Sequence, residues 1–511
     1  MNIKQAKQYI KDSVKIYLKK DEYGEYRIPV VRQRPIFLLG APGIGKTSIM
    51  EQVAQELGIA LVSYSMTHHT RQSALGLPFI EHKNYGGHRV DVSEYTMSEI
   101  IASIYDVMEE SGIREGILFL DEINCVSETL SPSMLQFLQY KTFGRHRVPE
   151  GWVIVTAGNP PEYNKSVRQF DVVTMDRLRI LEVEEDFGAW KDYALERGIH
   201  GAITGFLDLK KENFYRIETT AEGRSYVTAR GWEDLSAALL LYEEEGLPAD
   251  ETLVGQYLRN ERIVKEFTAY YDLYQKYKKD YQVDEILSGV FTDETAAKAH
   301  GAAFDERLSL LGMLMDRVQG DIRELMQSCD YLAELVKLLR ALHGPLLNAG
   351  AAGDGDLGAV LERVRAQQEK KLHSLEAANA LSAAEKRRIK EVIKFLRQVY
   401  MEVQREQKMR GSLSGADGFA LIKTSYEKQI AGMRQKTEQV QQKLHHLFSF
   451  VQKAFADGNE MLILVTHLTV NEYSARFIGI FGCPDYQKHN QELMLSERQA
   501  SLQREIAELE L

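Results

Sequence analysis

The first 185 residues alternate short apolar runs with amphipathic stretches. Continuous apolar runs of this length are typical of strands buried on both faces of a parallel sheet. These runs are Pro35–Gly40, Ala60–Met66, Gly116–Asp121, Trp152–Ala157 and Leu178–Val183. Helical spacing is found between them, over residues 47–57, 97–110 and 131–140. Repeated strand–helix units predict an α/β domain around a parallel sheet with right-handed connections.

Beyond about Glu184 the strand signals stop and the apolar positions recur with helical spacing. Segments 186–198, 230–246, 257–277 and 293–343 are predicted to be helical. The stretch LLNAGAAGDGDLGA is rich in Gly and Ala and has no periodicity, which predicts a linker. The predicted organisation is an α/β domain (1–185), a helical lid (186–277), a helical region (278–345), a linker (346–359), a helical hairpin or coiled-coil-like arm (360–457) and a small region of mixed structure (458–511).

Two long helices are expected in the arm. Ser382 and Glu385 form a capping-box pattern before the first helix. The second helix has a heptad-like apolar seam from Ile422 to Leu447. The stretch Gly411–Gly418 between them predicts a turn, so the pair forms either an antiparallel hairpin that projects as an arm or two helices of an ordinary bundle. After Gly458, β-branched and aromatic runs precede a polar helix, which predicts mixed structure.

The composition is that of a globular protein. The 511 residues are 44% hydrophobic and carry a net charge of -11, enough apolar material for more than one core. The acidic balance argues against nucleic acid as the main ligand. Cys125, Cys329 and Cys483 lie too far apart for a metal knuckle or a disulfide framework, so we expect free thiols in a reducing cytosol. The N-terminus lacks the apolar core of a signal peptide, and no apolar run is long enough to span a bilayer, which predicts a cytoplasmic protein.

The stretch LGAPGIGKTSIM contains the spacing Gly-x4-Gly-Lys-Thr of a phosphate-binding loop. Glycines let backbone amides approach phosphate oxygens closely, and the following helix aims its N-terminal amides at the same place. Lys46 would place its charge on the β- and γ-phosphates, and Thr47 would offer its hydroxyl to Mg²⁺. The predicted binding residues are Gly40, Ala41, Pro42, Gly43, Ile44, Gly45, Lys46, Thr47 and Ser48.

A pair of acids follows the third predicted strand, in GILFLDEIN. Asp121 ends the strand and would hold Mg²⁺ through water, as the second metal-site residue beside Thr47. Glu122 would polarise a water molecule against the γ-phosphate. An adjacent acid of this kind points to ATP hydrolysis rather than to transfer of the phosphoryl group to another substrate. The predicted cofactors are ATP and Mg²⁺.

Further polar residues follow in a suggestive order along the chain. Asn159 ends the fourth predicted strand, where its amide would hold the attacking water or contact the γ-phosphate. Arg177, just before the fifth strand, is the first candidate for an arginine finger toward a neighbouring subunit, and Arg168 is the second. Arg230, at the start of a helix beyond the sheet, would reach back to the γ-phosphate. An ordinary ion pair is the alternative for each arginine.

Taken in this order, the motifs resemble those of the AAA+ ATPases, and residues 1 to about 250 look like the MoxR family. The resemblance rests on the GxPGxGKT loop, the LDEIN strand end, SMLQFLQ, TAGNP, an Asp-Arg-Leu form of the finger and a Thr-Ala-Arg-Gly form of the second sensor. The last two depart from the common pattern. The expected fold class is therefore a parallel-sheet P-loop NTPase (AAA+) core with an α-helical lid, followed by a mainly helical C-terminal region with a hairpin arm.

This resemblance implies a ring, commonly a hexamer, with ATP bound between subunits. Glu122 would act within its own subunit and the arginine finger across the interface. It also implies an insert after the second strand, which Pro78–Val92 fits because NYGGH has the composition of a hairpin turn. Family members often work with a partner that carries a von Willebrand factor A domain, as chaperone-like remodelling machines or in metal-cofactor insertion.

Two other functions remain open from the sequence. A nucleic-acid motor, such as a restriction-type translocase, would use Arg145, His146 and Arg147, together with the basic group at 386–388. A scaffold would use ATP only for assembly, with little turnover. Stimulation of the ATPase by DNA and the rate of turnover separate these functions from a protein-remodelling ring.

Overall fold

The computed structural model describes residues 1–493 apart from a few short gaps. The gaps are residues 69–71, 73, 75, 164–165, 169, 221–222, 352–356, 412 and 457, and residues 494–511 also lie outside the description. The chain folds into two compact units. Unit 1 contains Met1–Ala189 and Arg363–Ile393, and unit 2 contains Trp190–Glu362 and the chain from Lys394 onward.

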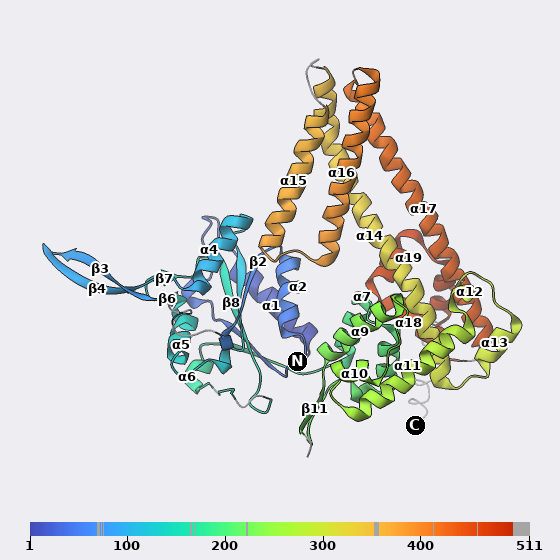
Figure 1. The fold of residues 1–511 in the computed structure, drawn as a ribbon, viewed down its shortest axis with the longest axis horizontal. Coiled ribbons are helices and arrows are strands. Elements are labelled where there is room, and N and C mark those ends of the chain that lie inside the picture. The colour runs from blue at the N-terminus through green and yellow to red at the C-terminus, as the bar shows by residue number, and fades with distance from the viewer. Residues whose placement is uncertain are drawn as a thin grey trace, which may run out of the picture. The chain divides into compact units, whose positions relative to one another are not determined.

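Unit 1 is built around a five-stranded parallel sheet with strand order β2-β5-β8-β1-β9 (Figure 1). The strands are β1 (Ile36–Gly40), β2 (Ala60–Ser65), β5 (Gly116–Asp121), β8 (Trp152–Gly158) and β9 (Arg179–Val183). All five predicted strands are present, within one residue of the expected ends. Every residue of β8 is buried, because layers of helices cover both faces of a parallel sheet. The carboxyl ends of all five strands therefore meet at one edge.

The helices of unit 1 follow the predicted pattern closely. They are α1 (Ile3–Tyr17), α2 (Lys46–Leu57), α4 (Glu99–Ser111), α5 (Ser131–Tyr140) and α6 (Val172–Met175), with short 3-10 turns η1 (Val30–Arg32), η2 (Met66–His68) and η3 (Ile123–Cys125). Helix α1 begins at a capping box in which Asn2 accepts the Gln5 amide and Gln5 returns the bond. Its apolar stripe packs against α2.

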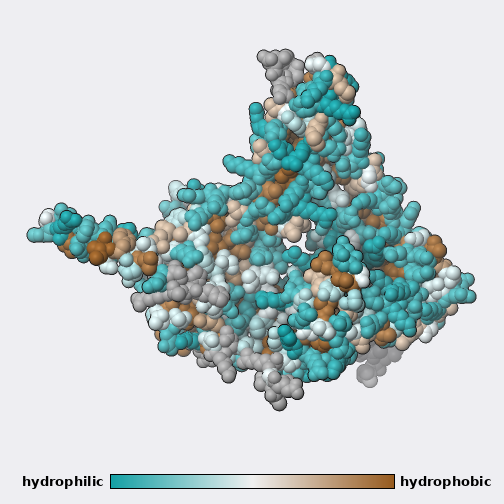
Figure 2. Space-filling view, viewed as in Figure 1, coloured by the Kyte–Doolittle hydropathy of each residue, from teal (hydrophilic) through white to brown (hydrophobic). Residues whose placement is uncertain are grey.

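The insert after β2 is a long antiparallel hairpin that extends away from the sheet (Figure 1), as the sequence predicts. Its strands are β3 (Pro78–Tyr85) and β4 (His88–Tyr95). Gly86 and Gly87 at the tip have φ of 59° and 89°, the positive values that a type I′ turn requires. Figure 2 shows apolar side chains exposed along the hairpin among hydrophilic ones.

A second, short hairpin holds the base of this insert through ion pairs. It consists of β6 (Thr142–Phe143) and β7 (His146–Arg147). Arg145 in its turn pairs with Glu94 and, at 3.4 Å, with Glu81 of the insert. Lys83 pairs with the same two carboxylates. Part of the predicted basic group is therefore already engaged with acidic side chains.

The described part of unit 2 consists of helices and one hairpin of strands. Its helices are α7 (Phe187–Arg197, which begins in unit 1), α8 (Gly201–Leu209), η4 (Lys211–Asn213), α9 (Ala229–Glu244), α10 (Glu251–Tyr257), α11 (Glu261–Tyr281), α12 (Val283–Leu287), α13 (Asp293–His300), α14 (Phe304–Ala351), α17 (Gly415–Ala454), α18 (Glu460–Val470) and α19 (Glu472–Phe481). Helices α15 (Leu357–Ala377) and α16 (Ala383–Arg410) are each shared between the two units.

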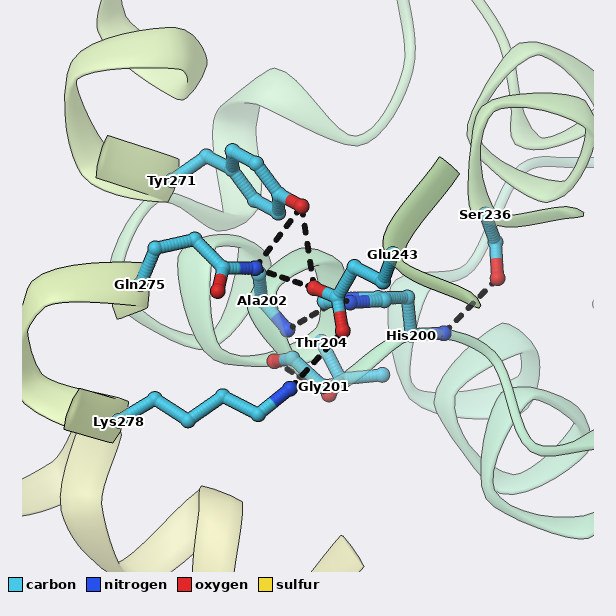
Figure 3. A network of polar contacts seen from close by, with 9 residues as sticks. All are labelled: His200, Gly201, Ala202, Thr204, Ser236, Glu243, Tyr271, Gln275 and Lys278. Atoms are coloured by element: carbon cyan, nitrogen blue, oxygen red, sulfur yellow. Dashed lines mark hydrogen bonds and ion pairs between the residues drawn. The ribbon is translucent and has the colours of Figure 1, made fainter. Parts of the chain in front are cut away.

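A half-buried polar network joins the start of α8 to α9 and α11 within unit 2 (Figure 3). The Glu243 carboxylate accepts hydrogen bonds from His200 Nε2 (2.8 Å), Tyr271 Oη (3.0 Å) and Lys278 Nζ (2.9 Å), and from Gln275. Burial alone would raise the pKa of Glu243, but the hydrogen bonds from His200 and Lys278 outweigh it and hold this pKa well below its usual range. Glu243 therefore stays ionised at neutral pH and ties the three helices together.

The pKa of Asp316 in α14 is shifted in the opposite direction to that of Glu243. Its Oδ2 atom is fully buried and has no hydrogen-bond partner among the described residues. It borders a cavity of about 70 Å³ that Tyr270, Tyr274 and His467 also line. Burial raises the pKa of Asp316 to about 7, and the charge of Arg323 offsets only part of that effect.

Replacing Asp316 by Asn is expected to stabilise the protein at alkaline pH. The folded state keeps a proton on Asp316 that the unfolded state releases near pH 4, so the wild-type protein loses stability as the pH rises from about 4 to about 7. Asn carries no charge, so the Asp316→Asn variant should not lose this stability. The difference in unfolding free energy between the variant and the wild type should therefore grow by about 1–3 kcal/mol between pH 5 and pH 8. Urea unfolding at both values measures it, with Asp284→Asn, 79% exposed in the side chain, as control. An equal gain at both values would contradict the assignment.

Three secondary-structure predictions for the second half are wrong. Strands continue after Glu184, since β10 (Arg216–Thr220) and β11 (Gly223–Val227) form an antiparallel hairpin. The prediction missed this hairpin because its strands contain many polar residues and no continuous apolar run. The helix expected over 293–343 is broken by residues 301–303 between α13 and α14. The mixed structure expected over 458–511 is helical as far as it is described, because α18 and α19 bury Leu464, Leu468 and Phe477 in a helical core. A short apolar run fits a buried helix as well as a strand.

The predicted linker and arm also differ from the structure. Helix α14 continues through Ala351 and α15 begins at Leu357, so every described residue of the linker predicted over 346–359 is helical. Residues 352–356 fall outside the description. Leu346 is fully buried, and its carbonyl lies directly against Gly415 at the start of α17. Packing of this kind overrides a weak local pattern. The long seam of α17 packs chiefly along α14 (Figure 1), so α16 is not its main partner. Helix α17 begins directly after its N-cap Ser414, so the second half of the turn predicted over 411–418 is helical.

Candidate nucleotide site

The phosphate-loop sequence forms the turn between β1 and α2. Gly43 and Gly45 have φ of 74° and 99°, a region that residues with side chains rarely enter. Gly40 is packed so tightly that an added Cβ would lie 2.6 Å from the Val183 carbonyl of the neighbouring strand. Helix α2 begins directly at Lys46, so its first amides face the loop. This is the backbone geometry of an anion cradle.

Lys46 lies inside the loop. Its side chain is 8% exposed, and Nζ donates to the carbonyls of Gly40 and Ala41 at 2.7 Å each. A third bond, of 2.9 Å, reaches Oδ1 of Asn159 at the end of β8. Because β8 is the neighbour of β1 in the sheet, the strand order alone brings this amide beside the loop. The predicted pair Lys46 and Asn159 therefore belongs to one site.

Thr47 and Asp121 also come together. The Thr47 hydroxyl donates to Asp121 Oδ2 at 3.1 Å, across the width of β8 that separates their strands. A hydroxyl and a carboxylate are the hard oxygen ligands that Mg²⁺ takes, usually with several waters and the phosphates of the nucleotide. These two residues therefore fit a Mg²⁺ ion, which would neutralise charge on the β- and γ-phosphates.

Glu122 adopts an unusual backbone conformation, with φ of 55°. Its carboxylate Oε2 accepts hydrogen bonds from Ser65 Oγ (2.9 Å) and Thr67 Oγ1 (3.0 Å), both at the carboxyl end of β2. Sequence analysis missed these two hydroxyls. Their signal was a pair of hydroxyl residues at the end of an edge strand, which is too common to single them out. In this state the Glu122 carboxylate is restrained by neutral donors.

Asn124 is a third residue that sequence analysis missed. It follows the acid pair, and its Nδ2 donates to the Asn159 carbonyl at 2.8 Å. Its Oδ1 is buried without a hydrogen-bond partner among the described residues, packed against Gly158. The side chain thus links the end of β5 to the end of β8 and positions the backbone that carries Asn159.

Cys125, the next residue, is not a nucleophile candidate. Burial raises the pKa of its thiol, and the nearby charges of Glu122 and Asp121 raise it further. The thiol stays protonated at neutral pH. In the part of the chain that the structure describes, Cys125, Cys329 and Cys483 form no disulfide.

The two candidate finger residues differ in their surroundings. Arg168 forms an ion pair of 2.8 Å with Glu128 of the same chain. The Arg177 guanidinium is exposed and makes no hydrogen bond or ion pair with any described residue. Asp171, one turn earlier, caps α6 through the Thr174 amide. Arg177 is therefore the more available of the two for another molecule.

Arg230 lies in unit 2, exposed in the first turn of α9. Thr228 caps this helix by accepting the Gly231 amide. The geometry within unit 1 does not involve Arg230, and its contact with the nucleotide stays a prediction.

Residues 36–175 match the family described as AAA, ATPase family associated with various cellular activities. The match begins at β1 and ends at α6, so it contains the loop, the acid pair and Asn159. A search of the curated proteins gave no match to the chain. Within the described residues, no helix combines the length and the apolar character needed to cross a bilayer. The match supports an AAA-type ATPase domain over residues 36–175, the part of unit 1 that contains the loop, the acid pair and Asn159.

Proposed function

We propose that the protein hydrolyses ATP in a Mg²⁺-dependent reaction at the edge of the sheet in unit 1. The observation that carries the proposal is the convergence of the loop with Asp121, Glu122 and Asn159 from three neighbouring strands. Lys46 holds phosphate oxygens, Thr47 and Asp121 hold the metal, and residues 40–48 supply the cradle. Asn159 orients the attacking water.

In this proposal Glu122 is the general base. It accepts a proton from water as the water oxygen bonds to the γ-phosphorus and the bond to the β–γ bridging oxygen breaks. The hydroxyls of Ser65 and Thr67 donate to one oxygen of this carboxylate and hold it at the end of β2. Glu122 must leave these donors, at least in part, to act.

The MoxR-like pattern supports a homo-oligomeric ring, commonly a hexamer, with Arg177 acting on the neighbouring subunit's nucleotide. The Arg177 guanidinium makes no hydrogen bond or ion pair with a described residue, although its charge acts on Asp171, so it is accessible to another subunit. In the same scheme Arg230 contacts the γ-phosphate and the helices of 186–277 act as the lid.

We further propose that the ring remodels a protein, with a von Willebrand factor A domain protein as a partner. The exposed β3–β4 hairpin, with Ile80 69% and Tyr85 58% exposed, offers apolar contacts to a protein. The nucleic-acid alternative is weakened, because Arg145 is paired with Glu81 and Glu94, and Lys386 with Glu376. Strong, salt-sensitive stimulation of the ATPase by DNA would reverse this preference.

Replacing Arg177 by Ala is expected to lower kcat at least about tenfold and leave ATP binding unchanged, since a finger acts on the charge of the transition state. Arg168→Ala is the matched control and should keep kcat within about twofold. Steady-state phosphate release and fluorescent-nucleotide titration measure the two quantities. If Arg168→Ala has the larger effect, the finger assignment passes to Arg168. If neither variant changes kcat, the site is not shared between subunits in this way.

A further inference from the structure

The turn between α15 and α16 is docked on the open edge of the AAA sheet. Strand β2 is an edge strand, and its Ala60 amide points inward to the Glu115 carbonyl beside β5. Leu61, the next residue, therefore points its backbone groups outward. Its amide donates to the Ala378 carbonyl at 2.9 Å, and its carbonyl accepts from Asn379 Nδ2 at 3.3 Å. A segment more than three hundred residues away thus pairs with β2 in place of a sixth strand.

The turn is shaped for this contact. Asn379 has a φ of 50°, in the left-handed region that Asn tolerates better than most residues. The flanking Ala378 and Ala380 are 0% and 2% exposed and belong to the same apolar core as the sheet. Gln55 of α2 donates to the Leu381 carbonyl at 3.4 Å. The segment Arg363–Ile393 is accordingly part of unit 1, although the chain leaves unit 1 before and after it.

Strand β2 leads from this turn to the proposed catalytic carboxylate. Leu61 lies four residues before Ser65 on the same strand. Because strand residues alternate in direction, the backbone N–H and C=O groups of both residues point toward the open edge of the sheet. Ser65 and, just beyond it, Thr67 hold Glu122. Leu61 and Ser65 lie about 13 Å apart along this strand. Because β2 is paired with β5 from Ala60 to Ser65, we expect a shift at Leu61 to reach Ser65.

Helices α15 and α16 connect the turn to unit 2 through the covalent chain. Each helix begins or ends at the turn and crosses the boundary between the units, at residues 362–363 and 393–394. A displacement of either helix along its axis would therefore pull on the backbone that holds Leu61.

We propose that the Ala378–Leu381 turn is a positioning element that restrains Glu122 through β2, with Asn379 as its positioning residue. The proposal rests on the proposed function, because it assigns regulation to the same ATPase site. While the turn is docked, Ser65 and Thr67 keep their hydrogen bonds to Glu122 and hydrolysis is slow. When unit 2 moves the helices, β2 relaxes and Glu122 is released.

The test is Asn379→Gly. This change removes the side-chain hydrogen bond from Asn379 Nδ2 to the Leu61 carbonyl. It keeps the left-handed backbone conformation, which Gly adopts freely. Amide hydrogen exchange over β2 should become faster, and kcat should rise about two- to fivefold, with unchanged affinity for ATP. Lys390→Ala, on the exposed surface of α16, is the control and should change neither quantity.

A double-mutant cycle separates positioning from mere stabilisation of the edge. In a Ser65→Ala, Thr67→Val background, kcat should already be raised, and Asn379→Gly should add nothing further. Additive effects on kcat, or faster exchange without any rise in kcat, would overturn the coupling. Unchanged exchange in Asn379→Gly would overturn the role of Asn379. Because exchange does not depend on turnover, a wild-type protein that lacks ATPase activity would instead count against the proposed function.

Discussion

Glu122→Gln is expected to bind ATP with wild-type affinity and to lower kcat by about 10²–10⁴-fold, the usual contribution of a general base. Gln is isosteric with Glu and can still accept hydrogen bonds from Ser65 and Thr67 through its amide oxygen. The fold of the site should therefore persist while the proton acceptor is lost. Single-turnover cleavage of ATP and equilibrium nucleotide binding measure the two properties separately.

Asp121→Asn is a useful comparison for this variant. The amide oxygen of Asn can still accept the Glu122 amide, which Asp121 accepts at 2.9 Å, so the local turn should persist. The charge that binds the metal is lost, so the Mg²⁺ concentration required should rise. Glu122→Gln should leave that requirement unchanged. Full activity in Glu122→Gln would show that Glu122 is not the base.

Lys46→Met is expected to raise the Kd for Mg²⁺–ATP about a hundredfold or more. A buried ammonium that makes charged hydrogen bonds to phosphate contributes about 3 kcal/mol, which converts to that factor. Met keeps the length and the apolar stem of the side chain without its charge. Isothermal titration with ATP measures the change.

Lys46→Met is also expected to lower the free energy of unfolding in the absence of nucleotide. The ammonium is the donor to the carbonyls of Gly40 and Ala41 and to Asn159, and these acceptors would lose it. Circular dichroism must show that the variant is folded before its affinity is interpreted. Lys15→Met, on the exposed face of α1, should bind ATP as the wild type does. Wild-type affinity in Lys46→Met would contradict the assignment of the loop.

The sheet and most of the site were predictable because their signals are local. A strand buried on both faces needs a continuous apolar run, and β5 has such a run that ends at Asp121. The glycines of the loop are required by backbone torsions that other residues avoid. In a parallel sheet the carboxyl ends meet at one edge, so the order of motifs along the chain was enough to bring Lys46, Asp121 and Asn159 together.

The rest depends on contacts between distant segments. Ser65 and Thr67 have no pattern that marks them as partners of Glu122, and only the position of β2 beside β5 brings them there. The docking of Asn379 on Leu61 joins residues that no local periodicity relates. The apolar run of α18 was compatible with strand and helix alike, and packing against neighbouring helices decided between them.

Turnover of ATP with Glu122 as the base is tested most directly by phosphate release from Mg²⁺–ATP. The release is measured for the wild type and for Glu122→Gln across a range of protein concentrations. The wild type should release phosphate at a rate per subunit that rises with concentration if the proposed ring assembles, while Glu122→Gln retains bound, uncleaved ATP. A wild-type protein that binds ATP but releases no phosphate at any concentration would contradict the claim and favour an ATP-dependent scaffold.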